Sequence, residues 1–371
     1  MELKLTKDTF DPEFASESEI QEMLEKEAEN GLEDLFYFDK YILGYKDMEE
    51  NPHRELCDFM YNDRIPECEI NEPKGYLKFS GKNKKLIEEP RGTFKSTVVT
   101  VGYSLYRVTL NPNIRILIAS EKLSNAQKFL SEIKGHIEGN EYFRTLYGEM
   151  DKKKNDVVWN DSEIIVADRT KNMKESTITT AGIDVTKVGM HYDEIIVDDP
   201  VSPSNTTSKE QIDKVFDWYK NLLSLLEPGG KLIIIGTRWD YGDLYGSLQE
   251  DPHKDMFDIL VRKAEWVDSD GKKQLLFPTR LTVPFLEEQK QIQGSYLFSC
   301  NYLNEPVSTD DQLFREEWFK KYIDNDIKNK YLNKFLCVDP AISMVDGRDY
   351  TVFTIVGVDE NNNLFILIMH T

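Results

Sequence analysis

Three short segments, each placed after an apolar run, carry residue types suited to phosphate and metal chemistry. The first is EPRGTFKST at residues 89–97, which a helical pattern follows. A phosphate-binding loop needs backbone N–H groups that face the phosphates, a lysine for the β/γ oxygens and a hydroxyl for Mg²⁺. Lys95 and Ser96 supply the lysine and the hydroxyl, and Thr97 comes next in the chain.

This first segment departs from the pattern GxxxxGK[ST] at both glycine positions. Glu89 and Phe94 stand where that pattern has glycine, and Gly92 lies inside the loop instead. Taken alone, the segment therefore fits a solvated Lys–Ser pair at the start of a helix equally well.

The second segment, HYDEIIVDDP at residues 191–200, is an apolar run that ends in two acids. If the run is a strand, Asp198 and Asp199 lie at its carboxyl end, where open α/β sheets bind ligands. Asp198 could then hold Mg²⁺ through its water shell, and Asp199 could orient an attacking water. An acidic pair between a strand and a turn is also a common solvated arrangement.

The third segment, KLIIIGTRWD at residues 231–240, places Gly236, Thr237 and Arg238 directly after an apolar run. Such a polar strand tip could sense a γ-phosphate and transmit its loss to neighbouring elements. The alternative is a turn in which Arg238 pairs with a surface acid. The order of the three segments favours the first interpretation, because a Lys–Ser loop, a double acid and a polar strand tip follow one another at separations typical of P-loop ATPases.

The composition is that of a globular protein long enough for two domains. The 371 residues are 40% hydrophobic and 30% charged. No apolar run approaches the roughly 18 residues of a membrane span, and no secretory signal opens the chain, so we expect a cytoplasmic protein without membrane contact. Four cysteines without CxxC spacing indicate reduced thiols. The net charge of −21 argues against a protein that coats nucleic acid but allows weak, transient contact.

From about residue 85 onward, short β-branched runs alternate with longer helical patterns. The runs at residues 86–87, 114–119, 164–167, 195–197 and 232–235 have the composition of strands buried on both faces. Between them, SNAQKFLSEIKGHIEG is amphipathic, with Ser124 as its candidate helix N-cap. This alternation predicts a doubly wound α/β domain with a parallel sheet.

We divide the chain into four expected segments. A helical, acidic arm covers residues 1–50, an ATPase core 51–240, a lid or linker subdomain 241–330, and a set of strands 331–371. In the last segment, KFLCVD is one strand and TVFTIVGVDENNNLFILIMH forms two more around an Asn-rich turn. A three-stranded meander without a covering helix is marginal by itself, so we expect further chain beyond it.

From about Asn51 to its end, the chain resembles the large terminase subunit of tailed bacteriophages. PRGTFKST looks like that family's variant Walker A loop, IIVDDP like its Walker B segment and GTRWDYGDLYGSL like its coupling motif. FPTRLTVPFLEEQKQIQGSYLFSCNYLNEPVS is similar to the family's linker, and CVDPAISMVDGRDYTVFTIVGV to the first strands of its RNase H-like nuclease. The resemblance implies an ASCE/RecA-like P-loop sheet, a small lid or linker subdomain and the start of an RNase H-like domain.

The resemblance also implies roles for residues around ATP. The nucleotide-binding loop would comprise Arg91, Gly92, Thr93, Phe94, Lys95, Ser96 and Thr97. Lys95 would bind the β/γ-phosphates, while Ser96 and Asp198 would hold Mg²⁺. Asp199 would stand where many members have a catalytic glutamate, one methylene longer.

Further residues of the coupling and nuclease segments follow from the same resemblance. Arg91 would stabilise transition-state charge, in cis or across a ring interface, and Thr237 and Arg238 would couple hydrolysis to motion. NPHRELCDFM resembles the region that approaches the adenine. Asp339 matches the first divalent-metal ligand of an RNase H-like site, which needs several acids. The family's later acids would lie beyond Thr371, and Asp349 fits a solvent-facing turn at least as well, so we expect no DNA cleavage by this chain as given.

By resemblance, the chain would be the ATP-driven motor that moves double-stranded DNA into a procapsid in the host cytoplasm. Its partners would be that DNA, the portal protein, the small terminase subunit and further copies of itself in a ring, expected to be a pentamer on the procapsid. Candidates for a DNA-gripping surface are the lysines of KGYLKFSGKNKK and DKKKN, which are Lys74, Lys78, Lys82, Lys84, Lys85, Lys152, Lys153 and Lys154. A solvated loop face is the simpler interpretation of both runs.

Two other functions stay open at this point. An SF2-type DNA helicase or translocase would share the ATP chemistry but requires a second RecA-like domain, whereas this sequence turns to a strand pattern at Lys334. A packaging scaffold that does not hydrolyse ATP is favoured by the missing glycines and opposed by Lys95, Ser96 and Asp198.

Overall fold

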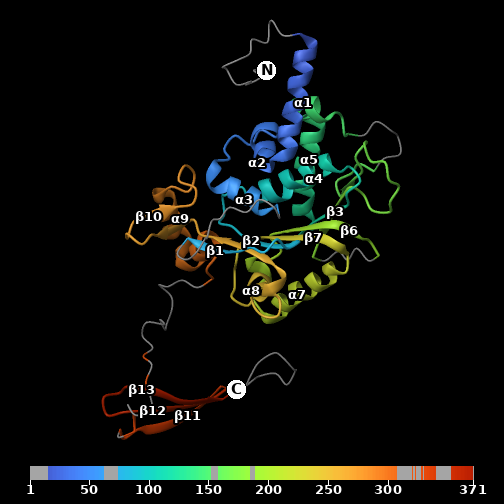
Figure 1. Cartoon of the computed structure of the whole chain (residues 1–371). Helices are drawn as coiled ribbons and strands as arrows, with labels where there is room; N and C mark the ends of the chain where they lie inside the picture. The colour runs from blue at the N-terminus through green and yellow to red at the C-terminus, as the bar shows by residue number, and fades with distance from the viewer. Residues whose placement is uncertain are drawn as a thin grey trace. The chain divides into compact units, whose positions relative to one another are not determined.

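The computed structural model describes residues 16–61, 74–151, 158–183, 189–306, 320, 322, 327–328, 330–339 and 352–370. The chain forms two compact units, Met1–Asp311 and Gln312–Thr371. The first unit is built on an eight-stranded sheet with helices on both sides (Figure 1). In the described part of the chain, no helix has the length and apolar character that crossing a membrane requires.

The sheet of the first unit is mainly parallel. Its strands are β1 (Gly75–Lys78), β2 (Lys84–Glu88), β3 (Ile116–Ser120), β4 (Glu163–Ile164), β5 (Ile178–Gly182), β6 (Tyr192–Asp198), β7 (Leu226–Gly236) and β8 (Asp258–Arg262). They lie in the order β1-β8-β2-β7-β6-β3-β5-β4. The edge strands β1 and β4 run antiparallel to their neighbours. Because β7 lies between β2 and β6, the strands that precede the three polar segments are adjacent and parallel.

Helices cover both faces of this sheet (Figure 1). On one side are α1 (Glu17–Glu33), α2 (Leu35–Tyr37), α3 (Glu55–Phe59), α4 (Tyr103–Leu110), α5 (Leu123–Gly139) and α6 (Glu141–Tyr147). On the other are α7 (Lys209–Leu223) and α8 (Leu244–Gln249). Short helical turns connect these elements at Phe38–Ile42, Glu50–Arg54, Thr97–Gly102, Pro203–Asn205 and Lys254–Met256.

Each face of the sheet has its own apolar core. Along β6, Ile196 packs into the core beneath α4 and α5, whereas Ile195 and Val197 pack into the core beneath α7 and α8. Ile233 and Ile234 of β7 divide between the two cores in the same way. Successive side chains of a strand point to opposite faces, so an unbroken apolar run fills both cores at once.

A smaller apolar cluster lies beside the sheet. Its elements are β9 (Glu265–Val267), β10 (Lys273–Leu275), α9 (Val283–Phe298) and the turn Ser299–Leu303. The buried side chains of this cluster include Phe277, Leu281 and Phe298, and Phe94 of the first polar segment packs against them.

The second unit contains three antiparallel strands in sequence order. These are β11 (Asn333–Asp339), β12 (Val352–Val358) and β13 (Leu364–His370). In the turn between β12 and β13, the Asp359 carboxylate accepts hydrogen bonds from the backbone N–H groups of Asn361 and Asn363, both at 2.9 Å. The predicted three-stranded meander and its Asn-rich turn are therefore present.

The doubly wound α/β fold is confirmed, but several sequence-based details are wrong. The run at 164–167 contributes only the two-residue edge strand β4, because Ile164 pairs with Ile178 and the chain then leaves the sheet. Val166 is nevertheless buried, which explains its apolar character. The prediction missed β5 entirely. Ser124 is not an N-cap, because α5 already begins at Leu123, after the extended residue Lys122.

The sheet also draws on the segment expected to form the lid or linker. β8 lies between β1 and β2, and it is the parallel neighbour of β2 on the side away from β7. The expected segment 241–330 thus contains one strand of the main sheet in addition to the small cluster around α9. The acidic arm contains α1, whose first turn has a capping box formed by Ser16 and Glu19.

Candidate functional site

The carboxyl ends of β2, β7 and β6 meet at one edge of the sheet, and the three polar segments begin there. The Lys95 ammonium lies 3.5 Å from Asp199 Oδ2. Ser96 Oγ donates a hydrogen bond to Asp198 Oδ1 at 3.0 Å, although the two residues are 102 positions apart in the chain. The fold therefore brings a lysine, a hydroxyl and two carboxylates together at a sheet edge where α/β proteins bind ligands.

Asp198 is the most deeply buried acid of this group. It is 1% exposed, and it accepts hydrogen bonds from the hydroxyls of both Ser96 and Thr100. Burial, together with the adjacent Asp199 carboxylate, raises the pKa of Asp198 above its usual range. The carboxylate is therefore held in place by hydroxyl donors but lacks enough positive charge to stabilise its ionised form fully.

These groups fit a magnesium ion that arrives with phosphate. Mg²⁺ prefers oxygen ligands and is usually bound by one or two protein groups plus substrate phosphates. The Ser96 hydroxyl and the Asp198 carboxylate offer two such oxygens. Within the described ranges, no group of three or more His, Cys, Asp or Glu side chains is arranged to hold a metal ion. Any ion at Ser96 and Asp198 would thus need further oxygens from a bound nucleotide or water.

Asp199 adopts a left-handed backbone conformation, with φ of 44°. Its N–H donates to the carbonyl of Ile235 on β7 at 2.9 Å, which fixes the turn that ends β6. Left-handed backbone costs a non-glycine residue roughly 1–2 kcal/mol, so the surrounding contacts must stabilise it. This turn keeps the Asp199 side chain beside Lys95 and partly open to solvent.

Gly236, at the end of β7, lies close to both Asp199 and α8. A Cβ atom at Gly236 would lie 1.8 Å from the Tyr245 hydroxyl oxygen and 2.9 Å from Asp199 Oδ1. No side chain fits in this space without displacing one of them. Tyr245 of α8 is fully buried, so a side chain at position 236 would disturb both α8 and the Asp199 carboxylate.

The loop that carries Lys95 has two residues with positive φ. They are Gly92, with φ of 85°, and Phe94, with φ of 58°. Phe94 thus keeps a backbone conformation that glycine normally provides. Its ring lies 5.9 Å from the Phe277 ring and 5.5 Å from the His53 ring, measured between centroids. The Arg280 guanidinium lies 4.6 Å above the same ring. The missing glycine is therefore replaced by a side chain that anchors the loop to the small cluster.

The remaining loop residues, Thr93, Thr97 and Arg91, contact the loop itself or its neighbours. Thr93 Oγ1 donates to the carbonyl of Pro90 at 2.8 Å and closes the loop on itself. Thr97 begins the helical turn that continues into α4. Arg91 is exposed, with its guanidinium 5.5 Å above the Trp239 ring, and its N–H donates to the Asn301 carbonyl at 2.9 Å.

Thr237 and Arg238 do not join the group of the lysine and the two carboxylates directly. Thr237 is buried, and its hydroxyl has no hydrogen-bond partner among the residues that the structure describes. Arg238 Nη2 donates to the Tyr241 carbonyl at 3.1 Å, and its guanidinium lies 5.3 Å above the Tyr241 ring. The Arg238 N–H is 3.3 Å from Asn304 Oδ1. The third segment thus contacts the other two through its backbone and Trp239 rather than through the Arg238 side chain.

Two buried carboxylates precede the loop, and sequence reasoning assigned no role to either of them. Burial raises the pKa of Glu88 to about 8, and Gln249 of α8 donates a hydrogen bond to this carboxyl group. Glu89 accepts a hydrogen bond from Arg262 Nε at 2.5 Å. Arg262 Nη1 also donates to Glu55 at 2.9 Å. This buried ion triad connects the start of the loop to β8 and to α3.

The lysine-rich run at residues 74–85 is only partly available for binding. Lys85 is buried and lies 3.3 Å from Asp258 Oδ2, so its assignment to a DNA-gripping surface is wrong. Lys78 pairs with Asp255 at 2.8 Å. Lys152, Lys153, Lys154 and Asp349 lie outside the described residues. Asp339 is the last residue of β11, and its side chain also lies outside the description.

Comparison with known proteins finds similarity to phage packaging proteins at the level of structure. No family model and no curated protein matches the chain. Solved structures of phage packaging proteins are similar to it. The large terminase of a thermophilic bacteriophage, in complex with ADP, has a TM-score of 0.38 and 10% identity over 78% of this chain. This chain spans 63% of that protein's length.

The other two similar structures cover different shares of the chain. The ATPase domain of the large terminase of Thermus phage P74-26 has a TM-score of 0.38 and 13% identity, covering 62% of this chain and 90% of that domain. The Phi-28 gp11 DNA packaging motor has a TM-score of 0.38 and 12% identity, covering 71% of this chain and 75% of that protein.

Several residues around the site were missed by sequence reasoning. Thr100 could have been found, because it lies four residues after Ser96 on the following helical segment and so faces the same acid. Tyr245, Asn304 and Arg262 had no such signal. Their importance depends on which strands are neighbours, and that information is absent from local sequence.

Proposed function

We propose that this chain binds and hydrolyses ATP with Mg²⁺ and uses the energy to translocate double-stranded DNA during viral genome packaging. One observation carries the ATPase part of this proposal. The Lys95 ammonium and the Ser96 hydroxyl, from one loop, lie beside the Asp199 and Asp198 carboxylates of a strand two positions away in the sheet. This is the arrangement that phosphate and magnesium binding require of a P-loop protein.

In this proposal each residue has a separate task. Lys95 neutralises the β/γ-phosphates, and binding of the nucleotide displaces its ammonium from Asp199. Ser96 and Asp198 hold Mg²⁺, which supplies charge neutralisation to the phosphates when it is bound. Asp199, partly exposed and then released from Lys95, orients the attacking water. Thr237, with its buried hydroxyl, responds to the loss of the γ-phosphate.

Arg91 and Arg238 have different positions relative to this group. Arg91 is exposed on the loop, so it can act in cis or reach a nucleotide bound to a neighbouring copy. An arginine of this kind contributes about 10³–10⁵ in rate where it stabilises the transition state. Arg238, whose guanidinium lies against Tyr241, transmits changes at β7 toward α8.

The packaging part of the proposal rests on the resemblance of the loop, acid, coupling and linker segments to those of large terminases. It includes the expected partners, which are double-stranded DNA, the portal protein, the small terminase subunit and a ring of identical copies. Nuclease metal binding at Asp339 belongs to the same proposal and requires several further acids around the metal ions.

A steady-state ATPase assay with and without linear duplex DNA tests this proposal. Lys95→Ala should reduce turnover by about 10²–10³-fold, because it removes a charge that stabilises the transition state. Lys128→Ala, at an exposed position of α5, is the matched control and should retain wild-type turnover. Equal rates for wild type and Lys95→Ala would favour the scaffold that does not hydrolyse ATP.

A second assay separates a packaging motor from a helicase. Displacement of a triplex-forming oligonucleotide from linear duplex DNA reports translocation without strand separation, and release of one labelled strand reports unwinding. The packaging proposal expects ATP-dependent triplex displacement without unwinding. Unwinding activity would favour the helicase instead.

A further inference from the structure

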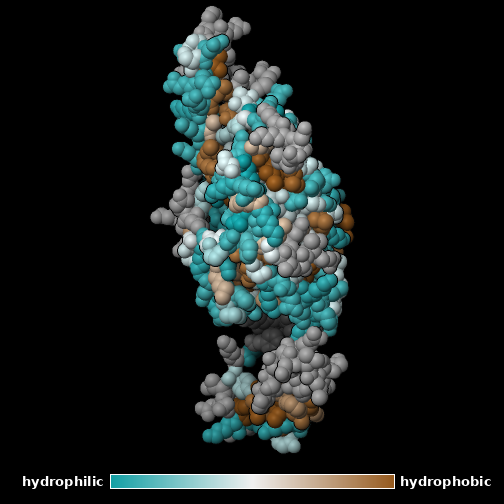
Figure 2. All heavy atoms as spheres, turned by 90° about the vertical axis from the view of Figure 1, so that its right-hand side faces the viewer, coloured by the Kyte–Doolittle hydropathy of each residue, from teal (hydrophilic) through white to brown (hydrophobic). Residues whose placement is uncertain are grey.

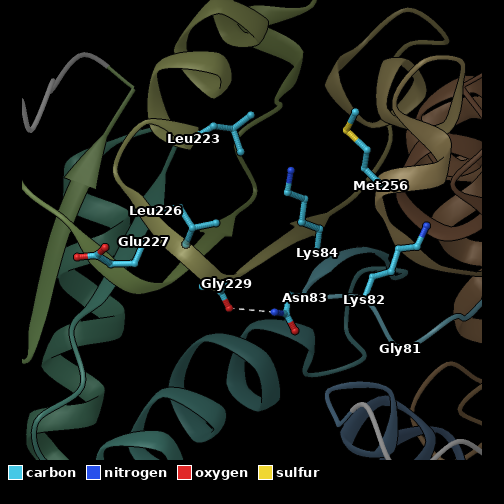
Figure 3. A pocket seen from close by; sticks show the side chains of 10 residues that line it. Gly81, Lys82, Asn83, Lys84, Leu223, Leu226, Glu227, Gly229 and Met256 are labelled. Atoms are coloured by element: carbon cyan, nitrogen blue, oxygen red, sulfur yellow. Dashed lines mark hydrogen bonds between the residues drawn. The ribbon is translucent and has the colours of Figure 1, made fainter.

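A cavity of about 520 Å³ lies at the amino end of the parallel strands, away from the candidate nucleotide site. It is formed by the start of β2, the start of β7, the end of α7 and the turn before β8 (Figure 3). Leu223 and Leu226 provide an apolar surface on one side of Lys84, whereas Met256 lies on its other side, and Lys82 extends nearby. The Asn83 side chain closes one side, donating to the Gly229 carbonyl at 2.9 Å. The cavity is therefore amphiphilic, with two ammonium groups beside an apolar surface.

The two lysines bring positive charge that nearby acids do not cancel. Lys82 and Lys84 are half-buried, and neither forms an ion pair with any residue in the described part of the chain. The acid in the cavity lining, Glu227, pairs with Arg115 Nη2 at 3.0 Å. Asp255, which also feels the charge of Lys82, pairs with Lys78 at 2.8 Å. In a chain of net charge −21, this cavity is a local site for an acidic ligand with an apolar side chain.

The same chain carries a segment of matching chemistry. α1 contains seven glutamates and one lysine over Glu17–Glu33. Ile20, in its first two turns, is 41% exposed. Figure 2 shows apolar side chains running along this helix between hydrophilic ones. Its opposite end is anchored, because the Tyr147 and Tyr106 hydroxyls donate to the carbonyls of Ala28 and Leu32. The exposed turns of α1 are therefore an acidic projection with an apolar stripe.

We propose that the exposed turns of α1 in one copy of this chain dock into the Lys82–Lys84 cavity of a second copy. The contact cannot form within one chain, because α1 rises from the helical layer on one side of the sheet whereas α7, which lines the cavity, covers the other side (Figure 1). The glutamates of α1 neutralise the two ammonium groups, and Ile20 covers the apolar surface of Leu223 and Leu226.

This contact joins two different surfaces and is therefore heterologous. Repeated head-to-tail contacts of this kind close into a ring when the rotation between copies allows it, and otherwise form a filament. The inference deepens the proposed function and rests on its ring of identical copies, but the contact uses neither the nucleotide nor the Lys95 site. Loss of ATP hydrolysis would leave it unaffected.

Duplex DNA is a less suitable occupant of the cavity. Its backbone presents phosphates without an apolar side chain for the surface formed by Leu223 and Leu226. Two lysines beside such a surface match an acidic amphipathic helix better. The DNA alternative predicts a different experimental outcome and is included in the test.

Sedimentation velocity over a range of protein concentrations tests the proposal on the whole chain. The wild type should self-associate, and added salt should weaken association by screening the charges. Lys82→Glu/Lys84→Glu should weaken it by about tenfold or more, because exposed pairs become repulsive. The matched control, Lys46→Glu/Lys128→Glu, makes the same change in charge at exposed positions elsewhere and should associate as the wild type does.

A charge exchange gives the decisive result. Glu19→Lys/Glu22→Lys in α1 should also weaken association, and combining it with Lys82→Glu/Lys84→Glu in one chain should restore it. A wild type that stays monomeric at every concentration, or a combined variant that is weaker than both parents, would overturn the proposal. So would a cavity variant that loses duplex DNA binding in fluorescence anisotropy while its self-association stays at the wild-type level.

Discussion

The two ends of the parallel strands in the main sheet differ in how their charged groups are held. At the carboxyl end, Asp198 is buried and bonded by two hydroxyls, and Lys95 lies beside Asp199. At the amino end, Lys82 and Lys84 flank an open cavity. A group that must act on a reacting phosphate benefits from fixed neighbours, because no reorganisation is then needed during the reaction. A surface that forms and releases contacts benefits from exposed charges.

The amino end also contains one lysine whose charge is buried beside a fixed partner, as the charge of Asp198 is at the carboxyl end. Lys85 is fully buried against Asp258, next in sequence to half-buried Lys84. Alternation along β2 decides which of the two adjacent lysines faces the interior. The adjacent residues Lys84 and Lys85 therefore differ more in burial than Lys85 and Asp198, which lie at opposite ends of the sheet.

The largest effect on stability is expected for Lys85→Met. It leaves the Asp258 carboxylate buried without its cation, so we expect a loss of about 3–5 kcal/mol in the free energy of unfolding. Lys84→Met is the matched control at the adjacent position and should change stability by less than about 0.5 kcal/mol. Urea denaturation followed by circular dichroism measures both, and equal losses would contradict the assigned difference in burial.

Gly236→Ala should have the next largest effect, and it acts at the carboxyl end. The added Cβ would lie 1.8 Å from the Tyr245 hydroxyl oxygen, so α8 or the β7 end must shift. We expect a loss of about 1–3 kcal/mol in stability and a strong loss of ATP turnover. Gly135→Ala in α5 is the control, because its Cβ would meet nothing within 4 Å. That variant should keep full turnover and gain about 0.5–1 kcal/mol.

Thr100→Val should change the pH dependence of ATP turnover. The hydroxyl lowers the pKa of Asp198 by donating to its carboxylate, so its removal raises that pKa further. Because the ionised form is the one proposed to hold Mg²⁺, we expect about tenfold lower kcat/KM at neutral pH and recovery toward alkaline pH. A uniform loss at every pH would show that Thr100 acts only through packing.

Glu88→Gln should alter stability in a pH-dependent way. The carboxyl group has a folded pKa of about 8, raised by burial, so the stability contributed by its neutral form is complete at acidic pH and is lost as pH rises to about 8. The charged groups that influence it are Arg238, which lowers the pKa, and Asp243, which raises it. Between the ordinary pKa of 4.5 and the folded pKa of about 8, the difference in unfolding free energy between variant and wild type should grow by up to about 1.4 kcal/mol per pH unit. Denaturation series at several pH values measure it, and a constant difference would count against the raised pKa.

Much of the fold followed from the apolar runs, and the exceptions have physical causes. Runs at 195–197 and 232–235 predicted β6 and β7, because residues buried on both faces must be apolar at every position. β5 is the fully buried strand ITTAG, whose two threonines kept it from being recognised as an apolar run. In the apolar run at 164–167, Ile164 is buried in β4, whereas Val166 is buried outside the sheet. Burial and strand pairing are separate properties, and composition reports only the first.

What the sequence determined by itself is the set of groups proposed for phosphate chemistry and their order along the chain. Lys95, Ser96, Asp198 and Asp199 could be named because their segments each follow an apolar run. The order of these segments along the chain is also typical of P-loop ATPases. The missing glycine at Phe94 could be noticed, but its replacement could not be explained from sequence.

Only the tertiary structure decided which of these groups meet and what supports them. The distance of 3.0 Å between Ser96 and Asp198 depends on β7 lying between β2 and β6. The packing of Phe94 on Phe277 depends on a cluster formed nearly 200 residues later in the chain. Local sequence encodes strand and helix through side-chain periodicity, whereas strand order and contacts between distant segments arise from the packing of the whole chain.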